Sequence, residues 1–200
     1  MLKLEDYKTI FIIASLAGTL IIASPTLASI LPARGTERFS ELYVLGPSRM
    51  AEGYAFNVKA EETYRVFLGV GNHMGSSAYY AVHVKLRDRG EPLPNATTIT
   101  PSSLPTLYEY RVFVGDGQTL ETPLNFSFRG LLFQGNSCRV ETIATDAQEV
   151  NVGKLVLWDS ENKGYFLELF FELWIFSPES GSFSYHNRFV GFWLNMTSLK

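Results

Sequence analysis

Residues 167–175 have the sequence LELFFELWI, with an apolar residue at every odd position. The even positions hold Glu168 and Glu172, and also Phe170 and Trp174. A period of two is typical of a β-strand with one face in a core, because successive side chains point to opposite faces. We therefore expect a strand here, with its odd positions in the core and its glutamates toward solvent.

The same alternation recurs along most of the chain. The other alternating runs are 63–70, 79–87, 107–114, 123–128 and 188–196. Residues typical of turns separate the runs, and no amphipathic helix of useful length follows residue 36. Many short antiparallel strands with one apolar face predict two packed sheets. We expect an all-β fold over residues 37–200, an immunoglobulin-like antiparallel β-sandwich of about seven to nine strands.

Residues 130–163 alternate poorly, and we interpret them as an insertion, with an extra hairpin around 154–158 as one form it could take. Six aromatic residues fall on the non-core parity of the last two strands, and four of them are the candidate partner surface: Phe170, Trp174, Phe176 and Trp193. Leaving these rings in water would forgo the free energy of burying apolar surface. Either the insertion covers them, or they form an exposed surface for a partner.

The N-terminal part carries a charge-free run of 23 residues from Thr9 to Leu31. A helix needs about 20 apolar residues to cross a bilayer core. The run predicts one transmembrane helix that follows a cytoplasmic N-terminus at residues 1–8 and precedes a connector at residues 32–36. Pro25 is the position where such a helix would kink or end.

A cleavable signal peptide is the competing interpretation of this run, with residues 26–28 as a small-residue cleavage motif. The acidic residues Glu5 and Asp6 and the length of the run favour a retained anchor. The positive-inside rule does not decide the orientation, because each flank carries two Lys or Arg residues. Three N-glycosylation motifs, at Asn95, Asn125 and Asn195, favour a domain outside the cytoplasm.

Composition and motifs argue against several kinds of chemistry. The net charge is −3 and the 17 basic residues are scattered, so the chain lacks the basic face that nucleic-acid binding requires. The single cysteine, Cys138, excludes an intrachain disulfide, although an intermolecular one stays open. His73, His83 and His186 lack metal-ligand spacing as a set, and no catalytic or cofactor motif occurs. We expect no catalytic site, metal or cofactor.

One resemblance rests on residues 37–47, ERFSELYVLGP, followed by AEGY at residues 51–54. This segment resembles the start of the soluble domain of an uncharacterised archaeal membrane-protein family, known as a domain of unknown function. The resemblance implies an extracytoplasmic immunoglobulin-like domain after membrane helices, and it supplies no catalytic residues. It covers residues 37–88 well and the last third loosely. This chain departs from the pattern in its single helix, its insertion and Ala55.

Two classes of function follow. The first is a membrane-anchored cell-surface module with a structural, adhesion or protein-interaction role, which contacts lipid through its helix and a protein partner on the surface. The second is an accessory subunit of a membrane complex, whose helix packs through the small residues Ala14, Ser15 and Gly18. A membrane-bound hydrolase is a third, less favoured class.

Overall fold

The structure is a computed structural model that describes residues 4–30, 37–146 and 148–198. The chain divides into two compact units, Met1–Arg38 and Phe39–Lys200, and each is considered by itself. The connector expected at residues 32–36 lies outside the described residues, as do Leu31 and the first three residues.

The first unit contains one helix, α1 (Leu4–Ile30), which continues past Pro25 without ending there. The four consecutive residues Ile10, Phe11, Ile12 and Ile13 are all exposed. Because consecutive residues on a helix point in different directions, apolar side chains surround the helix instead of forming one stripe. No helix in the described ranges combines the length and the hydropathy that crossing a membrane requires.

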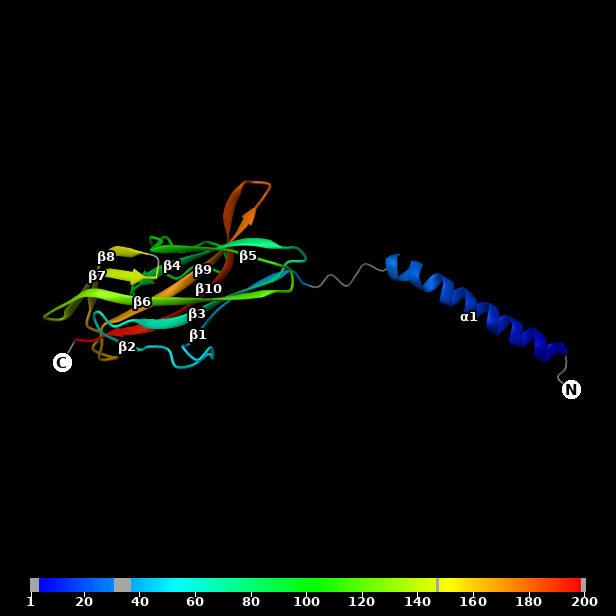
Figure 1. The fold of residues 1–200 in the computed structure, drawn as a ribbon, viewed down its shortest axis with the longest axis horizontal. Coiled ribbons are helices and arrows are strands. Elements are labelled where there is room, and N and C mark those ends of the chain that lie inside the picture. Colours follow the sequence, from blue (N-terminus) through cyan, green and yellow to red (C-terminus); the bar gives the residue numbers. More distant parts are fainter. Residues whose placement is uncertain (1–3, 31–36, 147, 199–200) are drawn as a thin grey trace. The chain divides into compact units, whose positions relative to one another are not determined.

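The second unit is a sandwich of two five-stranded sheets (Figure 1). The first sheet has the order β1-β3-β6-β7-β8, and every neighbouring pair is antiparallel. Its strands are β1 (Phe39–Leu45), β3 (Tyr64–His73), β6 (Thr119–Gln134), β7 (Ser137–Thr145) and β8 (Glu149–Leu157).

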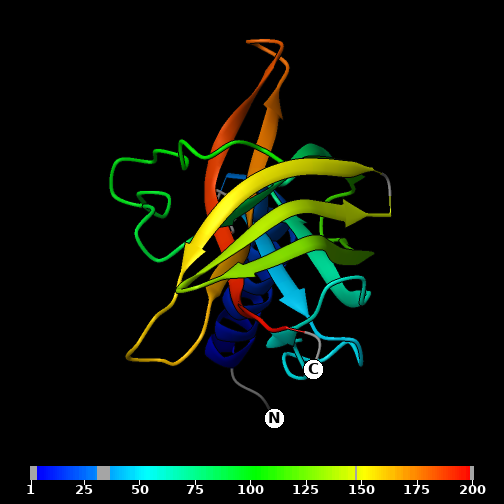
Figure 2. The same ribbon diagram turned by 90° about the vertical axis from the view of Figure 1, so that its left-hand side faces the viewer.

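The second sheet has the order β2-β10-β9-β4-β5, with one parallel pair, β2 and β10. Its strands are β2 (Asn57–Val58), β4 (Ala78–Arg87), β5 (Tyr108–Val114), β9 (Phe166–Ser177) and β10 (Ser182–Met196). Figure 2 shows the green-to-yellow strands β6, β7 and β8 crossing in front of the orange-to-red strands β9 and β10. The described residues thus form ten strands, more than the seven to nine expected.

The hydrophobic core lies between the two sheets. On β9 the odd positions Leu167, Leu169, Phe171 and Leu173 are completely buried, as the alternation predicts. They meet the buried residues of β3, β4 and β6, which include Val66, Val82 and Phe126. The expected two-sheet, predominantly β architecture is therefore confirmed.

Residues 130–163 are part of the sandwich itself and do not form the expected insertion. They supply the end of β6 and all of β7 and β8, with Cys138 and Val156 in the core. The alternation fails because the strands change parity. On β6, Phe128 faces the core, but after Gly130 (φ 67°) Phe133 does. Residues 154–157 belong to β8 and do not form a separate hairpin.

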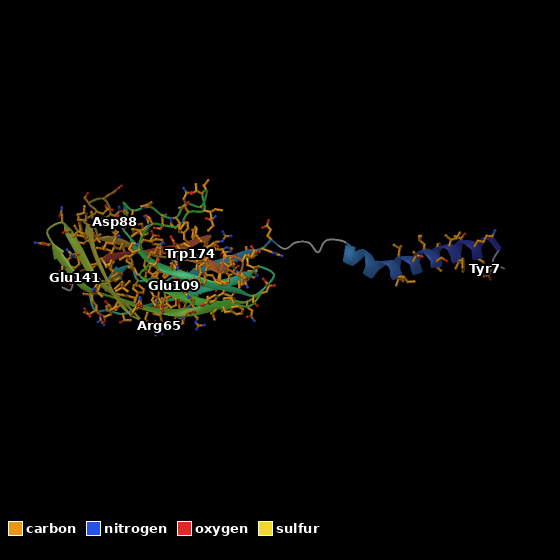
Figure 3. All side chains as sticks on the ribbon, turned by 90° about the horizontal axis from the view of Figure 1, so that it is seen from above. Tyr7, Arg65, Asp88, Glu109, Glu141 and Trp174 are labelled. Carbon is orange, nitrogen blue, oxygen red and sulfur yellow. The ribbon has the colours of Figure 1, made fainter. Side chains whose placement is uncertain are left out.

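The sandwich has two ends, which we call the Phe39 end and the Trp158 end. The Phe39 end holds the start of β1 and the turn between β3 and β4. The Trp158 end holds the end of β4, the turn between β6 and β7, and the connection from β8 to β9. In Figure 3, Asp88 and Glu141 lie toward the Trp158 end, and Trp174 lies nearer the middle.

Candidate functional site

The four aromatic residues predicted to form a partner surface project from one face of the second sheet, the face turned away from the core. Trp174 pairs with Tyr185 across β9 and β10, and Trp193 pairs with Glu168. Phe170 is completely buried, whereas Trp174, Phe176 and Trp193 are half-buried. The face is therefore largely covered and does not form an open patch.

One part of the cover is the connection from β4 to β5, residues 88–107, whose Arg89 lies over the Trp193 ring at 5.4 Å. Trp174 and Phe176 pack instead against rings of neighbouring strand segments, such as His83 and Phe183. The backbone N–H of Ser102 donates to Glu172 Oε1 at 2.8 Å, and Lys85 Nζ donates to the Ser102 carbonyl at 2.7 Å. Residues 130–163, which we expected to cover the rings, touch this connection at its two ends. Lys154 pairs with Glu91 and Asp159 with Arg89 at its start, and Gln148 Nε2 donates to the Leu107 carbonyl at 3.0 Å at its end. Residues 130–163 cannot lie across the face, because β7 and β8 are paired within the first sheet.

Charged residues beneath the cover form buried ion pairs. Lys85 Nζ lies 2.9 Å from Glu172 Oε2, and both side chains are almost completely buried. Arg87 pairs with Glu168, and each is only 8% exposed. The glutamates expected to face solvent are therefore buried, because a connection outside the strand pattern lies over them. Buried charges are tolerated only when they are paired.

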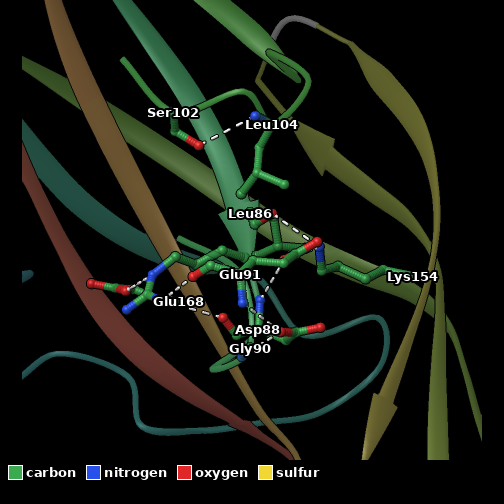
Figure 4. A network of polar contacts seen from close by, with 9 residues as sticks. Leu86, Asp88, Gly90, Glu91, Ser102, Leu104, Lys154 and Glu168 are labelled. Atoms are coloured by element: carbon green, nitrogen blue, oxygen red, sulfur yellow. Dashed lines mark hydrogen bonds and ion pairs between the residues drawn. The ribbon is translucent and has the colours of Figure 1, made fainter. Parts of the chain in front are cut away.

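Glu91 extends this network toward the first sheet. Its carboxylate accepts from the Asp88 backbone N–H at 2.8 Å and from Lys154 Nζ. Figure 4 shows Glu91 between Lys154 and the Asp88 segment, with Glu168 close by. Since Lys154 lies on β8 and also donates to the Leu86 carbonyl at 3.3 Å, the network joins the two sheets.

His83 lies at the border of the covered face. Its ring stacks on Trp174 with centroids 4.7 Å apart, and Nε2 is 2.9 Å from Glu109 Oε2. Burial lowers the pKa of His83, although the Glu109 carboxylate opposes this shift. The imidazole is therefore held by two neighbours, in contrast to the solvated side chain that its position on a polar strand face predicts.

Three polar atoms near Trp174 are buried without a hydrogen-bond partner among the described residues: Trp174 Nε1, Tyr185 OH and Asn187 Oδ1. The last two lie at a register shift in β10, where Asn187 takes a φ of 52°. Burial, together with the Glu172 charge, raises the pKa of Tyr185 to about 12. Such groups usually bind ordered water, so we expect water at this bulge.

A second polar network lies inside the sandwich. His186 Nε2 is 3.0 Å from Ser40 Oγ, which is 2.6 Å from Tyr80 OH, and Tyr80 donates to Asn72 Oδ1 at 3.0 Å. Ser40, Tyr80 and Asn72 are buried, so a substrate would not reach this serine–histidine contact. Burial, with a smaller effect of Arg188, lowers the pKa of His186. The network therefore has the features of a structural link between strands.

The remaining polar candidates also have structural surroundings. His73 stacks on Phe39 with centroids 4.5 Å apart. Within the described ranges, no three His, Cys, Asp or Glu residues are grouped so that they could hold a metal ion. Cys138 is completely buried, and burial raises its pKa to about 11. An intermolecular disulfide at Cys138 would therefore require the core to open.

The three glycosylation candidates differ in their surroundings. Asn95 is exposed in the β4–β5 connection, and its Oδ1 accepts from the Thr97 N–H at 2.9 Å. The Asn125 amide accepts a hydrogen bond from Arg65 through Oδ1 and donates one to Asp146 through Nδ2. The Asn195 amide accepts from the Tyr165 N–H and donates to Asn57. Of the three, Asn95 offers the most accessible amide nitrogen.

Two concave surfaces lie at the Trp158 end, where cavities of about 510 and about 690 Å³ share Trp158. Trp158 lies between β8 and β9 and is 40% exposed, next to the exposed Leu155 and Leu157 of β8. The first cavity is lined by Asp88, Arg89, Gly90, Leu155, Val156, Leu157, Trp158, Asp159 and Phe166. We take this end as the candidate functional site.

Our sequence interpretation placed Trp158 in an insertion and therefore missed this site. One signal could have found it. Trp158 is followed by the polar stretch DSENKG at residues 159–164, and an aromatic residue at the start of a surface connection is a typical binding residue.

Comparisons with known proteins give one family match and distant structural likenesses. A family model described as "Domain of unknown function (DUF1616)" matches residues 32–149. No curated protein matches the chain. A β-glucosidase from Listeria innocua in complex with glucose has a TM-score of 0.38 and 8% identity, over 80% of this chain. The chain spans only 16% of the length of that enzyme.

A second solved structure is the complex of zinc 2-glycoprotein and prolactin inducible protein from human seminal plasma. Its matching chain has a TM-score of 0.38 and 7% identity, over 82% of this chain and 99% of that chain.

Proposed function

The chain belongs to the family described as Domain of unknown function (DUF1616), and from that premise we propose that it is a membrane-anchored, extracytoplasmic β-sandwich that acts by binding and not by catalysis. Membership of a family of unknown function, expected from residues 37–54, is confirmed. An archaeal source and an immunoglobulin-like topology stay predictions.

Support for the membrane anchor comes from the first unit. Residues 9–31 carry no charge, and the exposed apolar side chains of α1 point to all sides. A helix that packs on a soluble core normally keeps one polar stripe. We propose that the helix is retained in the cell membrane, with the N-terminus in the cytoplasm and the sandwich outside.

The observation that carries the proposed binding role is the exposed Trp158 between two cavities. Leu155 and Leu157 are 55% and 70% exposed beside it. The aromatic face of β9, in contrast, is covered by the protein itself. Concave sites with aromatic walls and exposed apolar neighbours are typical of binding surfaces. We therefore place the binding role at the Trp158 end.

A photo-cross-linking experiment tests this placement. A photoreactive residue replaces Leu157 in the full chain, which is expressed in intact cells. Leu120, an exposed leucine on β6 near the Phe39 end, provides the matched control. We expect an adduct at position 157 and none at position 120. Equal adducts at both positions, or none at either, would count against a binding role for the Trp158 end.

Labelling of single cysteines tests the topology. Cys138 is buried, so the wild-type chain should not react with a membrane-impermeant maleimide and serves as the blank. Ser180→Cys places a thiol at the exposed β9–β10 turn, and Lys8→Cys places one before the charge-free run. On intact cells we expect labelling at position 180 and none at position 8 until lysis. The reverse pattern would contradict an extracytoplasmic sandwich.

The accessory-subunit role is the second candidate, and the surface of α1 favours it. A side chain added at Gly18 would meet no heavy atom of the described residues within 4 Å, and Ala14 lies one turn before it. Small residues at this spacing let membrane helices approach closely. Extraction in mild detergent, followed by cross-linking and mass spectrometry, separates the two roles. A partner retained by wild-type protein but lost in Gly18→Leu would support the accessory role.

A further inference from the structure

The larger cavity at the Trp158 end, which we call the Lys59–Lys163 cavity, has an aromatic wall. It is lined by Asn57, Lys59, Phe133, Trp158, Lys163, Gly164, Tyr165, Asn195, Met196, Thr197 and Ser198. Tyr165 contacts Trp158 edge-on at a centroid distance of 5.0 Å, and it contacts Phe133 in the same way at 5.4 Å. These contacts fix the three rings relative to one another and leave Trp158 accessible at the cavity edge.

The charged residues that line this cavity are all basic. Its lining includes the two lysines Lys59 and Lys163 and no aspartate or glutamate. The other two lysines of the described sandwich, Lys85 and Lys154, are held in ion pairs, whereas Lys59 and Lys163 have no carboxylate partner among the described residues. Lys59 and Lys163 are therefore the two lysines of the described sandwich that can pair with an external anion, and both border the same cavity.

The polar floor of the cavity is rigid. Asn195 Nδ2 donates to Asn57 Oδ1 at 2.9 Å, and Asn195 Oδ1 accepts from the Tyr165 N–H at 3.0 Å. The Thr197 hydroxyl donates to the Val58 carbonyl at 2.9 Å. These bonds tie β2, β10 and the 158–165 connection together, so a ligand would meet a preformed surface. Preorganisation of this kind reduces the entropic cost of binding.

From this combination we propose that the Lys59–Lys163 cavity binds an acidic glycan, a saccharide whose sugar units carry carboxylates. The apolar C–H face of a sugar ring fits against an exposed indole, and carboxylates pair with the two ammonium groups by charge-assisted hydrogen bonds. An acidic peptide fits less well, because extended peptides bind along sheet edges, and the edge strand that lines this cavity, β2, has only two residues. The assignment rests on the binding role proposed for the Trp158 end.

Calorimetry on the full-length chain in detergent micelles tests the ligand class. The probes are a hexasaccharide of galacturonic acid, the corresponding neutral hexasaccharide of galactose, and hexaglutamate. We expect the acidic saccharide to bind most tightly and its affinity to fall as salt concentration rises. In Lys59→Gln/Lys163→Gln its affinity should fall about tenfold, as expected for the loss of two exposed ion pairs.

The control Arg65→Gln/Arg111→Gln removes the same charge from exposed positions outside the cavity and should keep the affinity. Trp158→Ala should weaken both saccharides, with folding checked by circular dichroism. Equal affinity for the neutral saccharide, an unchanged lysine double variant, or tighter binding of hexaglutamate would overturn the proposal. If no saccharide binds but the cross-link at Leu157 persists, the ligand class is wrong and the binding function stands. If both fail, neither stands.

Discussion

At the residue scale, the pair formed by Lys85 and Glu172 has the largest expected effect on stability. Neither side chain has water to solvate its charge, and Ser102 bonds to both. Transfer of two charges from water into a protein interior costs several kcal/mol, and only their mutual pairing offsets that cost. Loss of one partner therefore leaves the other charge buried and uncompensated.

We predict that Glu172→Gln lowers the free energy of unfolding by about 3–5 kcal/mol. The matched control is Glu61→Gln, which removes an exposed pair with Arg129 and should cost less than about 1 kcal/mol. Urea unfolding of the full chain in detergent measures both. The double variant Lys85→Met/Glu172→Gln should recover part of the loss. Equal costs for the two single variants would contradict a buried, essential pair.

Cys138 provides a pH-dependent prediction at the same scale. Burial raises its pKa from 9.0 to about 11, so the folded state favours the neutral thiol. Below about pH 9 the thiol is neutral in both the folded and the unfolded state, so it causes no loss of stability there. As the pH rises from about 9 toward about 11, the thiol ionises only in the unfolded state, and the free energy of unfolding falls. Urea unfolding at several pH values should give a steeper alkaline loss for wild-type protein than for Cys138→Ala. Parallel curves would show that the thiol is not buried in solution.

At the element scale, the strands with uniform parity could be predicted from the sequence, and those that change parity could not. The odd positions of β9 are buried as expected, from Leu167 to Leu173. In β6 and β7 the core positions change parity near Gly130 and at the register shift between Val140 and Thr142. A fixed period of two does not predict such strands, because one irregular residue moves all later side chains to the other face of the sheet.

The β4–β5 connection was also beyond prediction, although it covers Glu172 and Trp193 on the face of the predicted partner residues. Its residues do not alternate, and nothing local shows that Ser102 would lie over Glu172. The positions of Phe170, Trp174, Phe176 and Trp193 on one face were predictable from parity. Their cover depends on contacts between segments some 70 residues apart, such as Ser102 and Glu172, which no local pattern encodes.

We predict that Ile99→Gly stabilises this connection. Ile99 has a φ of 52°, which is unfavourable for a β-branched residue, and its side chain is 58% exposed, so little burial is lost. The gain in free energy of unfolding should be about 1 kcal/mol. The neighbouring Thr98→Gly should instead destabilise by about 1 kcal/mol, because it adds backbone freedom and removes the hydroxyl contact with Thr100. Thermal unfolding compares them, and destabilisation by both would contradict the strained conformation of Ile99.

At the scale of the whole molecule, the matched family region and the folded unit have different limits. The family model ends at residue 149, but β9 and β10 follow it and lie in the middle of the second sheet. Without them, β4 would lose one neighbour and the core would lose Leu167 to Leu173. The sandwich therefore needs the C-terminal third, which the resemblance covered only loosely.

The location of the sandwich leads to a last prediction, which concerns glycan occupancy. If residues 37–200 lie outside the cytoplasm, a glycosylating host should modify Asn95, whose side chain is exposed and whose Nδ2 has no acceptor among the described residues. Asn125 and Asn195 should stay unmodified, because their amide nitrogens donate to Asp146 and Asn57.

Peptide mapping by mass spectrometry of protein from the native membrane measures occupancy at all three sites. Asn95→Gln serves as the control and should abolish the glycan at a small cost in stability, since its side chain bonds only within its own exposed turn. Asn195→Gln should destabilise the protein even without a glycan, because it disturbs the contact between β2 and β10. A glycan at Asn195 would mean that this contact opens before folding is complete, and three unmodified asparagines would remove the support that glycosylation gives to an outside location.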